Sequence, residues 1–272
     1  MKQNARFQAP AAASRIPVLA IDEREVRQAI ERKEFVLHYQ PQIEIATGGA
    51  VGLEALVRWN HPQQGLIFPD SFFCKIRELG MFEEFGWLIA ERGLSEIRQF
   101  SDPSQGIPRL TLKISAEFLR DTEFPDALAS MAKKYGVPAH MVAVEVSGRG
   151  TFMQMKSALD VLTRLRVKDV LLTVDDYGFG GVEIQQLHQI SATELKIDRP
   201  FVQNMFASEH DRTIVQKIIL IAHELDMKAV ADGVETEQQL EFLCHNGCDY
   251  AQGFYFSHPL RPEGITEWLK IY

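Results

Sequence analysis

A chain of 272 residues, 46% of them hydrophobic, is long enough to bury a large core, and a barrel of alternating strands and helices needs roughly 250 residues. Its formal net charge of −8 disfavours duplex nucleic acid as a partner, because phosphate neutralisation requires a basic face. A small phosphate-bearing ligand in a local pocket stays compatible with that charge. We expect no membrane span and no signal peptide, and three cysteines without framework spacing favour a cytoplasmic location.

The first 60 residues predict a leader, a helix and a hairpin. Residues 1–20, rich in Ala, Pro and Gln, are expected to form a disordered leader or linker before a single domain over 21–272. Asp22 is the expected N-cap of a helix that ends at Arg32. The turn residues Thr47-Gly48-Gly49 stand between two strand-like runs, which predicts that the first two strands are antiparallel neighbours.

Strand and helix patterns alternate along the rest of the chain. The predicted strands cover residues 35–40, 51–59, 110–115, 142–146, 170–175, 194–198, 228–231 and 249–252. A loop is expected over 60–69, and the main helices over 69–79, 82–99, up to 135, 152–165, 214–225, 237–244 and 262–269. Eight strands separated mostly by helices indicate an α/β fold, a TIM-like (β/α)8 barrel whose first strand is antiparallel.

The second predicted strand has two different faces. At a period of two residues, Leu53, Ala55, Val57 and Trp59 share an apolar face, and Glu54, Leu56 and Arg58 share the other. A strand buried on both faces carries two charges only where they serve a site. The alternative is an edge strand whose second face is exposed to water.

Acidic residues recur at or near the ends of the predicted strands. In a parallel barrel, the carboxyl ends of the strands form the functional face, so these side chains are expected to converge there. The acids are Glu54, Glu145, Asp175, Asp176 and Asp232. Any one of these acids alone is explained as a helix cap or a solvated charge. Five acids close together, however, repel one another unless cations lie between them. Oxygen ligands of this kind suit Mg²⁺ or Mn²⁺, and paired ions of this type hydrolyse phosphodiesters.

Short segments in these strands resemble the motifs of one family. They are Tyr39-Gln40-Pro41, Glu54-Ala55-Leu56-Val57-Arg58-Trp59, Asp175-Asp176-Tyr177-Gly178, Lys196-Ile197-Asp198, Gly233-Val234-Glu235-Thr236 and Gln252-Gly253-Phe254-Tyr255. In this order, from about Ile21 to the C-terminus, they closely resemble the EAL-domain family. Its members are bacterial cyclic-di-GMP phosphodiesterases with a barrel fold, and they open the ligand to pGpG with two Mg²⁺ or Mn²⁺ ions.

The resemblance implies a role for each matching residue. The implied metal ligands are Glu54, Glu145 and Asp175, with Asp176 for the second ion and Asp232 at the end of the seventh strand. Lys196 would position or activate the water, and Gln252 would support that site. The implied ligand-binding residues are Gln40, Leu56, Arg58, Glu235 and Phe254. An arginine suits phosphate, and an aromatic ring stacks on a base.

The chain departs from the family pattern at the site itself. The family has an Asn metal ligand where this chain has Lys113, whose ammonium has no acceptor and cannot ligate Mg²⁺. A Glu that braces the loop after the paired aspartates is replaced by Gly148. In that loop the family's Thr, Tyr and two Ser are replaced by Phe179, Gly181, Val182 and Glu183. The family Glu at the end of the seventh strand is Asp232, which is shorter by one methylene. We therefore expect the Lys113 ammonium to stand in for an absent cation, the alternative being that Lys113 turns to solvent.

These departures favour a degenerate EAL domain that acts as a regulator. It would bind a protein partner, cyclic-di-GMP, or both, without efficient hydrolysis. The protein partner is slightly favoured, because Lys113 and the altered loop disturb the nucleotide pocket itself. The alternative is an active but slow phosphodiesterase that needs Mg²⁺ or Mn²⁺, whereas a silent domain needs no metal. The resemblance leaves a homodimer open.

Overall fold

The computed structural model describes residues 21–101, 106–115, 117–147, 156–177 and 183–271. Four predicted features lie outside these ranges. They are the leader over 1–20, Gly148, the first residues of the helix predicted over 152–165, and the glycine-rich stretch 178–182.

Within the described ranges, nine strands form one sheet with the order β1-β9-β8-β7-β6-β5-β4-β2-β3, and a further pairing of β1 with β2 closes eight of them into a barrel. The strands are β1 (Phe35–Glu44), β2 (Ala50–His61), β3 (Gly65–Ile67), β4 (Arg109–Lys113), β5 (Val142–Ser147), β6 (Leu171–Tyr177), β7 (Glu194–Ile197), β8 (Lys228–Asp232) and β9 (Tyr250–Gln252). Strand β1 runs antiparallel to both of its neighbours, β2 and β9, and the other seven strands of the ring run parallel to one another. The predicted barrel with an antiparallel first strand is therefore confirmed.

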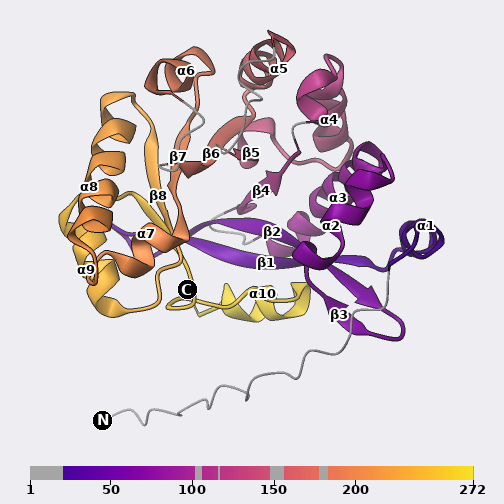
Figure 1. Ribbon diagram of the computed structural model, residues 1–272, viewed down its shortest axis with the longest axis horizontal. Coiled ribbons are helices and arrows are strands. Elements are labelled where there is room, and N and C mark those ends of the chain that lie inside the picture. Colours follow the sequence, from indigo (N-terminus) through magenta and orange to yellow (C-terminus); the bar gives the residue numbers. More distant parts are fainter. Residues whose placement is uncertain (1–20, 102–105, 116, 148–155, 178–182, 272) are drawn as a thin grey trace.

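The helices lie outside the strands, and α3, α4, α5, α6 and α8 follow one another around the barrel while α10 lies beside β1 (Figure 1). Their bounds are α1 (Glu23–Glu31), α2 (Phe73–Glu78), α3 (Phe82–Glu96), α4 (Phe124–Lys134), α5 (Lys156–Val167), α6 (Ile184–Gln189), α7 (Arg199–Asn204), α8 (Glu209–Glu224), α9 (Glu237–His245) and α10 (Pro262–Trp268). Asp22 caps α1 as predicted, and the structure adds a capping box with Glu25. In the described part of the chain, none of the helices is long and apolar enough to cross a lipid bilayer.

The structure corrects the predicted elements at several points. Strand β1 does not stop before Pro41 but continues to Glu44. Pro41 lies two residues after Tyr39, whose N–H and C=O pair with Leu260, so the N–H that proline lacks faces away from β2 and costs no hydrogen bond in that ladder. The loop predicted over 60–69 contains β3, and α7 precedes the long helix α8.

Both faces of β2 are buried, which rules out the edge-strand alternative. On the outward face Trp59 packs with Phe35 and Phe72, at ring-centroid distances of 5.1 and 6.0 Å, beneath the helices. Each such side chain contributes about 1.5–3 kcal/mol through burial. On the inward face Glu54 and Arg58 are only 4% and 8% exposed. The charges predicted for this strand therefore lie inside the barrel, where they need partners.

The three cysteines are expected to differ sharply in reactivity. Cys74 and Cys244 are exposed, whereas Cys248 is buried. Burial, and then the charge of Asp249, raises the pKa of the Cys248 thiol to about 12, so almost no thiolate is present at neutral pH. Brief alkylation of the folded protein at pH 8 should add two adducts by mass spectrometry, and alkylation in urea should add three. Rapid labelling of Cys248 in the folded protein would contradict the buried thiol.

Candidate functional site

Side chains from four different strands meet around the ammonium of Lys196, which is 2% exposed. The Nζ atom lies 2.8 Å from Glu54 Oε2, 2.9 Å from Glu145 Oε2 and 4.0 Å from Asp175 Oδ1. These residues lie on β7, β2, β5 and β6, and each side chain points to the interior because the strands alternate at a period of two. The convergence predicted for these three acids and Lys196 is therefore present in the fold.

A second ammonium reaches the same acids from the rim. Lys113 is the last residue of β4 and pairs in register with Glu145 of β5. Its Nζ donates to Asp175 Oδ2 at 2.5 Å and lies 3.4 Å from Glu145 Oε1, while 46% of the side chain stays exposed. Lys113 therefore faces the acids, and the alternative in which it turns to solvent is wrong.

The two lysines change the ionisation of the acids. Burial, and then the negative charge of Glu54, raises the pKa of Glu145 to about 8. Burial also opposes ionisation of Glu54 and Asp175, but the charge of Lys196, joined at Asp175 by that of Lys113, outweighs it and lowers both pKa values. Although burial disfavours the ammoniums, the acids raise the pKa of both lysines. Two ammonium groups thus face three carboxyl groups, and Glu145 is the one of the three that most readily takes up a proton.

Divalent ions fit this donor set poorly. Mg²⁺ and Mn²⁺ require oxygen ligands, and the ammonium of Lys113 offers three donors and no acceptor. At least one oxygen of each of the three acids already contacts an ammonium, and Glu145 Oε1 is buried without a hydrogen-bond partner among the described residues. No group of three or more His, Cys, Asp or Glu side chains in the described ranges is arranged to hold a metal ion. The residues present therefore do not fit the ions that the resemblance implies while Lys113 keeps this position.

Gln252 and Asp232 extend the cluster toward β8. The amide Nε2 of Gln252 donates to Glu54 Oε2 at 2.5 Å and to Asp232 Oδ1 at 3.1 Å. Asp232 Oδ2 lies 3.9 Å from the guanidinium of Arg199. Asp232 therefore belongs to the outer part of the site.

The fifth predicted acid, Asp176, is placed differently. Ser147 Oγ donates to Asp176 Oδ2 at 2.9 Å, and the Asp176 backbone has a φ of 56°, in the left-handed region. The contacts around Lys196 involve Glu54, Glu145 and Asp175, and do not include Asp176.

Three of the predicted ligand-binding residues line the inward faces of β1 and β2. Gln40 donates through Nε2 to the backbone oxygen of Ser257 at 3.2 Å, and Leu56 is half-buried. The Arg58 guanidinium lies 4.9 Å from the ring centroid of Phe68 and donates to Val57 O at 2.7 Å. Its Nε atom is buried without a hydrogen-bond partner among the described residues. Arg58 thus retains donor capacity suited to an anionic group.

The other two predicted ligand-binding residues follow β8 and β9. Glu235 is exposed and accepts from Gln203 Nε2 at 2.6 Å. Phe254 is 43% exposed, with the His258 ring 4.0 Å away and the Arg199 guanidinium 5.6 Å from its centroid. An exposed ring with a neighbouring cation is a suitable platform for a nucleobase.

Sequence reasoning missed Phe68 and Arg199. Arg199 comes directly after the segment Lys196-Ile197-Asp198, so a basic residue beyond the carboxyl end of β7 was the signal that could have identified it. Phe68 gives no such signal, because it lies in a segment predicted as loop and reaches Arg58 only through the β2–β3 hairpin.

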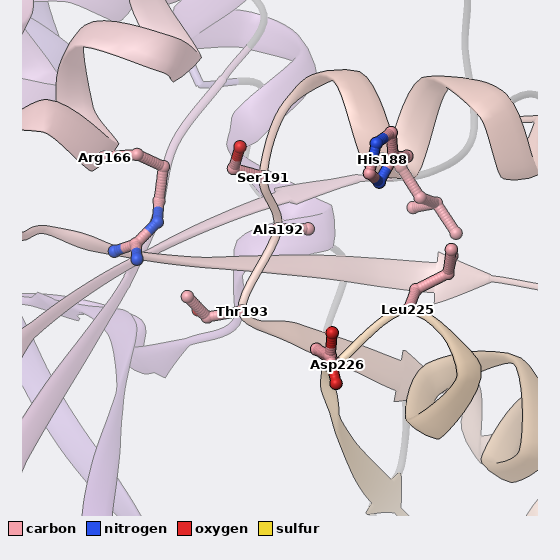
Figure 2. Close-up of a pocket in the computed structure, with 8 residues that line it drawn as sticks. Arg166, His188, Ser191, Ala192, Thr193, Leu225 and Asp226 are labelled. Carbon is pink, nitrogen blue, oxygen red and sulfur yellow. The ribbon is translucent and has the colours of Figure 1, made fainter.

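Two cavities lie apart from this cluster. One, of about 310 Å³, is lined by Arg166 of α5, His188 of α6 and the loops that lead into β7 and β8, at the amino ends of those strands (Figure 2). The second, of about 370 Å³, lies between β1, α3 and the start of α10 and includes His38 and Arg92. Neither contains a residue that the sequence analysis assigned to the site.

The pattern of the EAL domain matches residues 23–259, and the chain belongs to the EAL-domain family. It is 35% identical over 250 residues to the cyclic di-GMP phosphodiesterase NbdA of Pseudomonas aeruginosa, covering 92% of this chain and 32% of that protein. It is 28% identical to the cyclic di-GMP phosphodiesterase RocR of the same organism, covering 90% of this chain and 62% of RocR.

The structural comparison agrees with this assignment. A solved structure described as the PaMucR phosphodiesterase in complex with c-di-GMP has a TM-score of 0.83 and 32% identity, covering 89% of this chain and 98% of that one. The chain spans about a third of the length of the first curated relatives that it matches.

Proposed function

We propose that this EAL domain is a regulator that binds cyclic-di-GMP without efficient hydrolysis. The observation that carries the proposal is the position of Lys113, whose Nζ lies 2.5 Å from Asp175 Oδ2 and 3.4 Å from Glu145 Oε1. A positive charge among the acids supplies part of the neutralisation that a divalent ion would supply. It supplies neither a coordination position nor a metal-bound water, and those are what the hydrolysis requires.

The case for nucleotide binding rests on the residues around the cluster. Arg58 keeps unpaired donor capacity, and Phe254 offers an exposed ring beside Arg199. The relatives NbdA and RocR are named for cyclic di-GMP, and the PaMucR structure contains it. The protein partner expected from the sequence has no comparable support in the described contacts.

One observation favours an active phosphodiesterase as the second candidate. Lys196, Gln252 and three of the acids do converge, with distances of 2.5–2.9 Å between Glu54 or Glu145 and their donors. If a metal ion displaced Lys113 toward solvent, these groups would be in reach of a phosphodiester. Lys113 is 46% exposed, so such a displacement would not have to break up the core.

The test separates binding from turnover in the whole chain. With saturating cyclic-di-GMP and either Mg²⁺ or Mn²⁺, pGpG release should stay below about 0.01 per second, against roughly 1–1000 per second for ordinary enzymes. Calorimetric titration in EDTA should show saturable binding. Turnover in the ordinary range would refute the proposal in favour of the second candidate.

A matched pair of variants tests where the nucleotide binds. Arg58→Met should weaken binding by about tenfold or more, because a charge-assisted hydrogen bond contributes roughly 1.5–3 kcal/mol. Arg98→Met, which removes an arginine bonded to Tyr135 O on the outside, should leave the affinity unchanged. If no heat is released at high micromolar cyclic-di-GMP, with and without Mn²⁺, the nucleotide-binding role is refuted, and a protein partner remains as the regulatory hypothesis.

A further inference from the structure

A line of hydrogen bonds crosses the barrel interior and ends at the acid cluster. Arg109 of β4 donates through Nη2 to Gln42 Oε1 at 2.9 Å, and Gln42 Nε2 donates to Gln252 Oε1 at 2.9 Å. Gln252 Nε2 in turn donates to Glu54 Oε2 at 2.5 Å. All four side chains are less than 9% exposed, so bulk solvent has little access to these bonds. This line, from Arg109 through Gln42 and Gln252 to Glu54, is called the polar relay below.

The chemistry of Arg109 sets the direction of every bond in the relay. A guanidinium only donates, so Gln42 must turn its carbonyl oxygen to Arg109 and its NH₂ group to Gln252. Gln252 must then turn its oxygen to Gln42 and its NH₂ group to Glu54 and Asp232. The guanidinium donors at one end of the line and the carboxylate acceptors at the other therefore leave one arrangement for both carboxamides.

Arg109 is itself held firmly at the far end. Its Nη1 donates to Glu194, whose other oxygen accepts from Thr173 Oγ1 at 2.8 Å. The ring of Tyr250 lies 5.2 Å from the guanidinium carbon. An arginine with a buried carboxylate and an aromatic ring as partners has little freedom to change the group that it presents to Gln42.

A glycine allows Arg109 to reach Gln42. In the sheet, Gly52 of β2 pairs with Gln42 on one side and with Arg109 on the other, so it stands between them. A Cβ atom at Gly52 would lie 3.3 Å from Arg109 Nε and 3.1 Å from its backbone oxygen, which is tighter than ordinary packing. The missing side chain leaves the space through which Arg109 crosses β2.

We propose that Gln42, oriented by Arg109, is a positioning residue that holds the Gln252 carboxamide with its NH₂ group toward Glu54 and Asp232. The relay thereby makes Gln252 a donor at the site and keeps its oxygen away from any cation there. The inference goes beyond the proposed function, because it holds whether the domain is silent or active.

The Gln252 side-chain amide reports on the relay directly. In a protein with isotope-labelled glutamine, its NH₂ signals are assigned by their loss in Gln252→Met and should exchange slowly with solvent. Gln42→Met should shift them and speed their exchange by about tenfold, the change expected when one buried hydrogen bond is lost. Gln42→Glu keeps the acceptor for Arg109 and removes the donor, so it should have the same effect with almost no change in volume.

Two further variants separate positioning from general destabilisation. Gly52→Ala leaves both glutamine side chains unchanged, but its added methyl group crowds Arg109, so it should shift the Gln252 signals. Gln216→Met, which removes a surface glutamine bonded to Asn246, should remove its own signals only. The proposal is overturned if the Gln252 NH₂ signals keep their position and exchange rate in Gln42→Glu while the backbone spectrum shows a folded protein.

Discussion

Replacing Lys113 by Asn is expected to raise the affinity of the domain for Mn²⁺ by about 30-fold. A unit charge at about 4 Å interacts by roughly 4 kcal/mol at an effective dielectric of 20. Because 46% of the Lys113 side chain is exposed, we halve this energy to about 2 kcal/mol, and every 1.4 kcal/mol is tenfold in affinity. The variant also adds an amide oxygen that can ligate the ion. Calorimetric titration of both proteins with Mn²⁺ measures the change.

The control for this experiment is a lysine with a similar ion pair far from the site. Lys228 lies 2.7 Å from Asp249, and its side chain is 56% exposed, at the first residue of β8. Lys228→Asn should leave the Mn²⁺ affinity unchanged, because the lost charge is at the opposite end of the strand from Asp232. Equal Mn²⁺ affinity in Lys113→Asn and the unchanged protein would contradict the view that Lys113 competes with metal.

Lys196→Met is expected to lower the free energy of unfolding by about 3–5 kcal/mol at pH 8. Removing one partner of a buried ion pair leaves an uncompensated charge, and here Glu54 and Glu145 lose the ammonium at 2.8 and 2.9 Å. Urea denaturation monitored by circular dichroism measures the loss. Lys134→Met removes a lysine that is 65% exposed beside Glu91, and should leave the free energy of unfolding almost unchanged.

The effect of Lys196→Met should depend on pH. Without the ammonium, burial is no longer outweighed at Glu54, so its pKa in the folded state should rise above that of the unfolded chain, and the raised pKa of Glu145 should rise further. A carboxyl with a raised folded pKa binds a proton in the folded state that the unfolded state has released, so stability falls as pH rises between the two values. For Glu145 that window already runs from about 4.5 to about 8. The loss should therefore be smaller at pH 5 than at pH 8, and an equal loss would contradict the buried-charge explanation.

Local signals in the chain were enough to predict the barrel. The N-cap at Asp22 and the hairpin turn at Thr47-Gly48-Gly49 were predicted from the residue types alone, and the structure has Asp22 as the cap and Gly48 at a positive φ. Strand β3 was not predicted, because Gly65–Ile67 becomes a strand only by pairing with the end of β2. The strand predicted over 35–40 stopped before Pro41 for the same reason. Whether a proline fits within β1 depends on which edge of the strand is hydrogen-bonded at that residue, and only the pairing in the sheet decides that.

At the site, the residue types set the possible chemistry and the fold set the partners. The sequence alone determined that a lysine replaces an amide at residue 113 and that acids end several strands, because charge and donor capacity belong to the side chain itself. Only the tertiary structure decided that Lys113 contacts Asp175, that Asp176 turns to Ser147, and that Arg109 directs Gln252 through Gln42. Those contacts depend on strand register and on the closure of the barrel, which bring together residues far apart in the chain, and the strength of each depends on a distance and a degree of burial that no local pattern specifies.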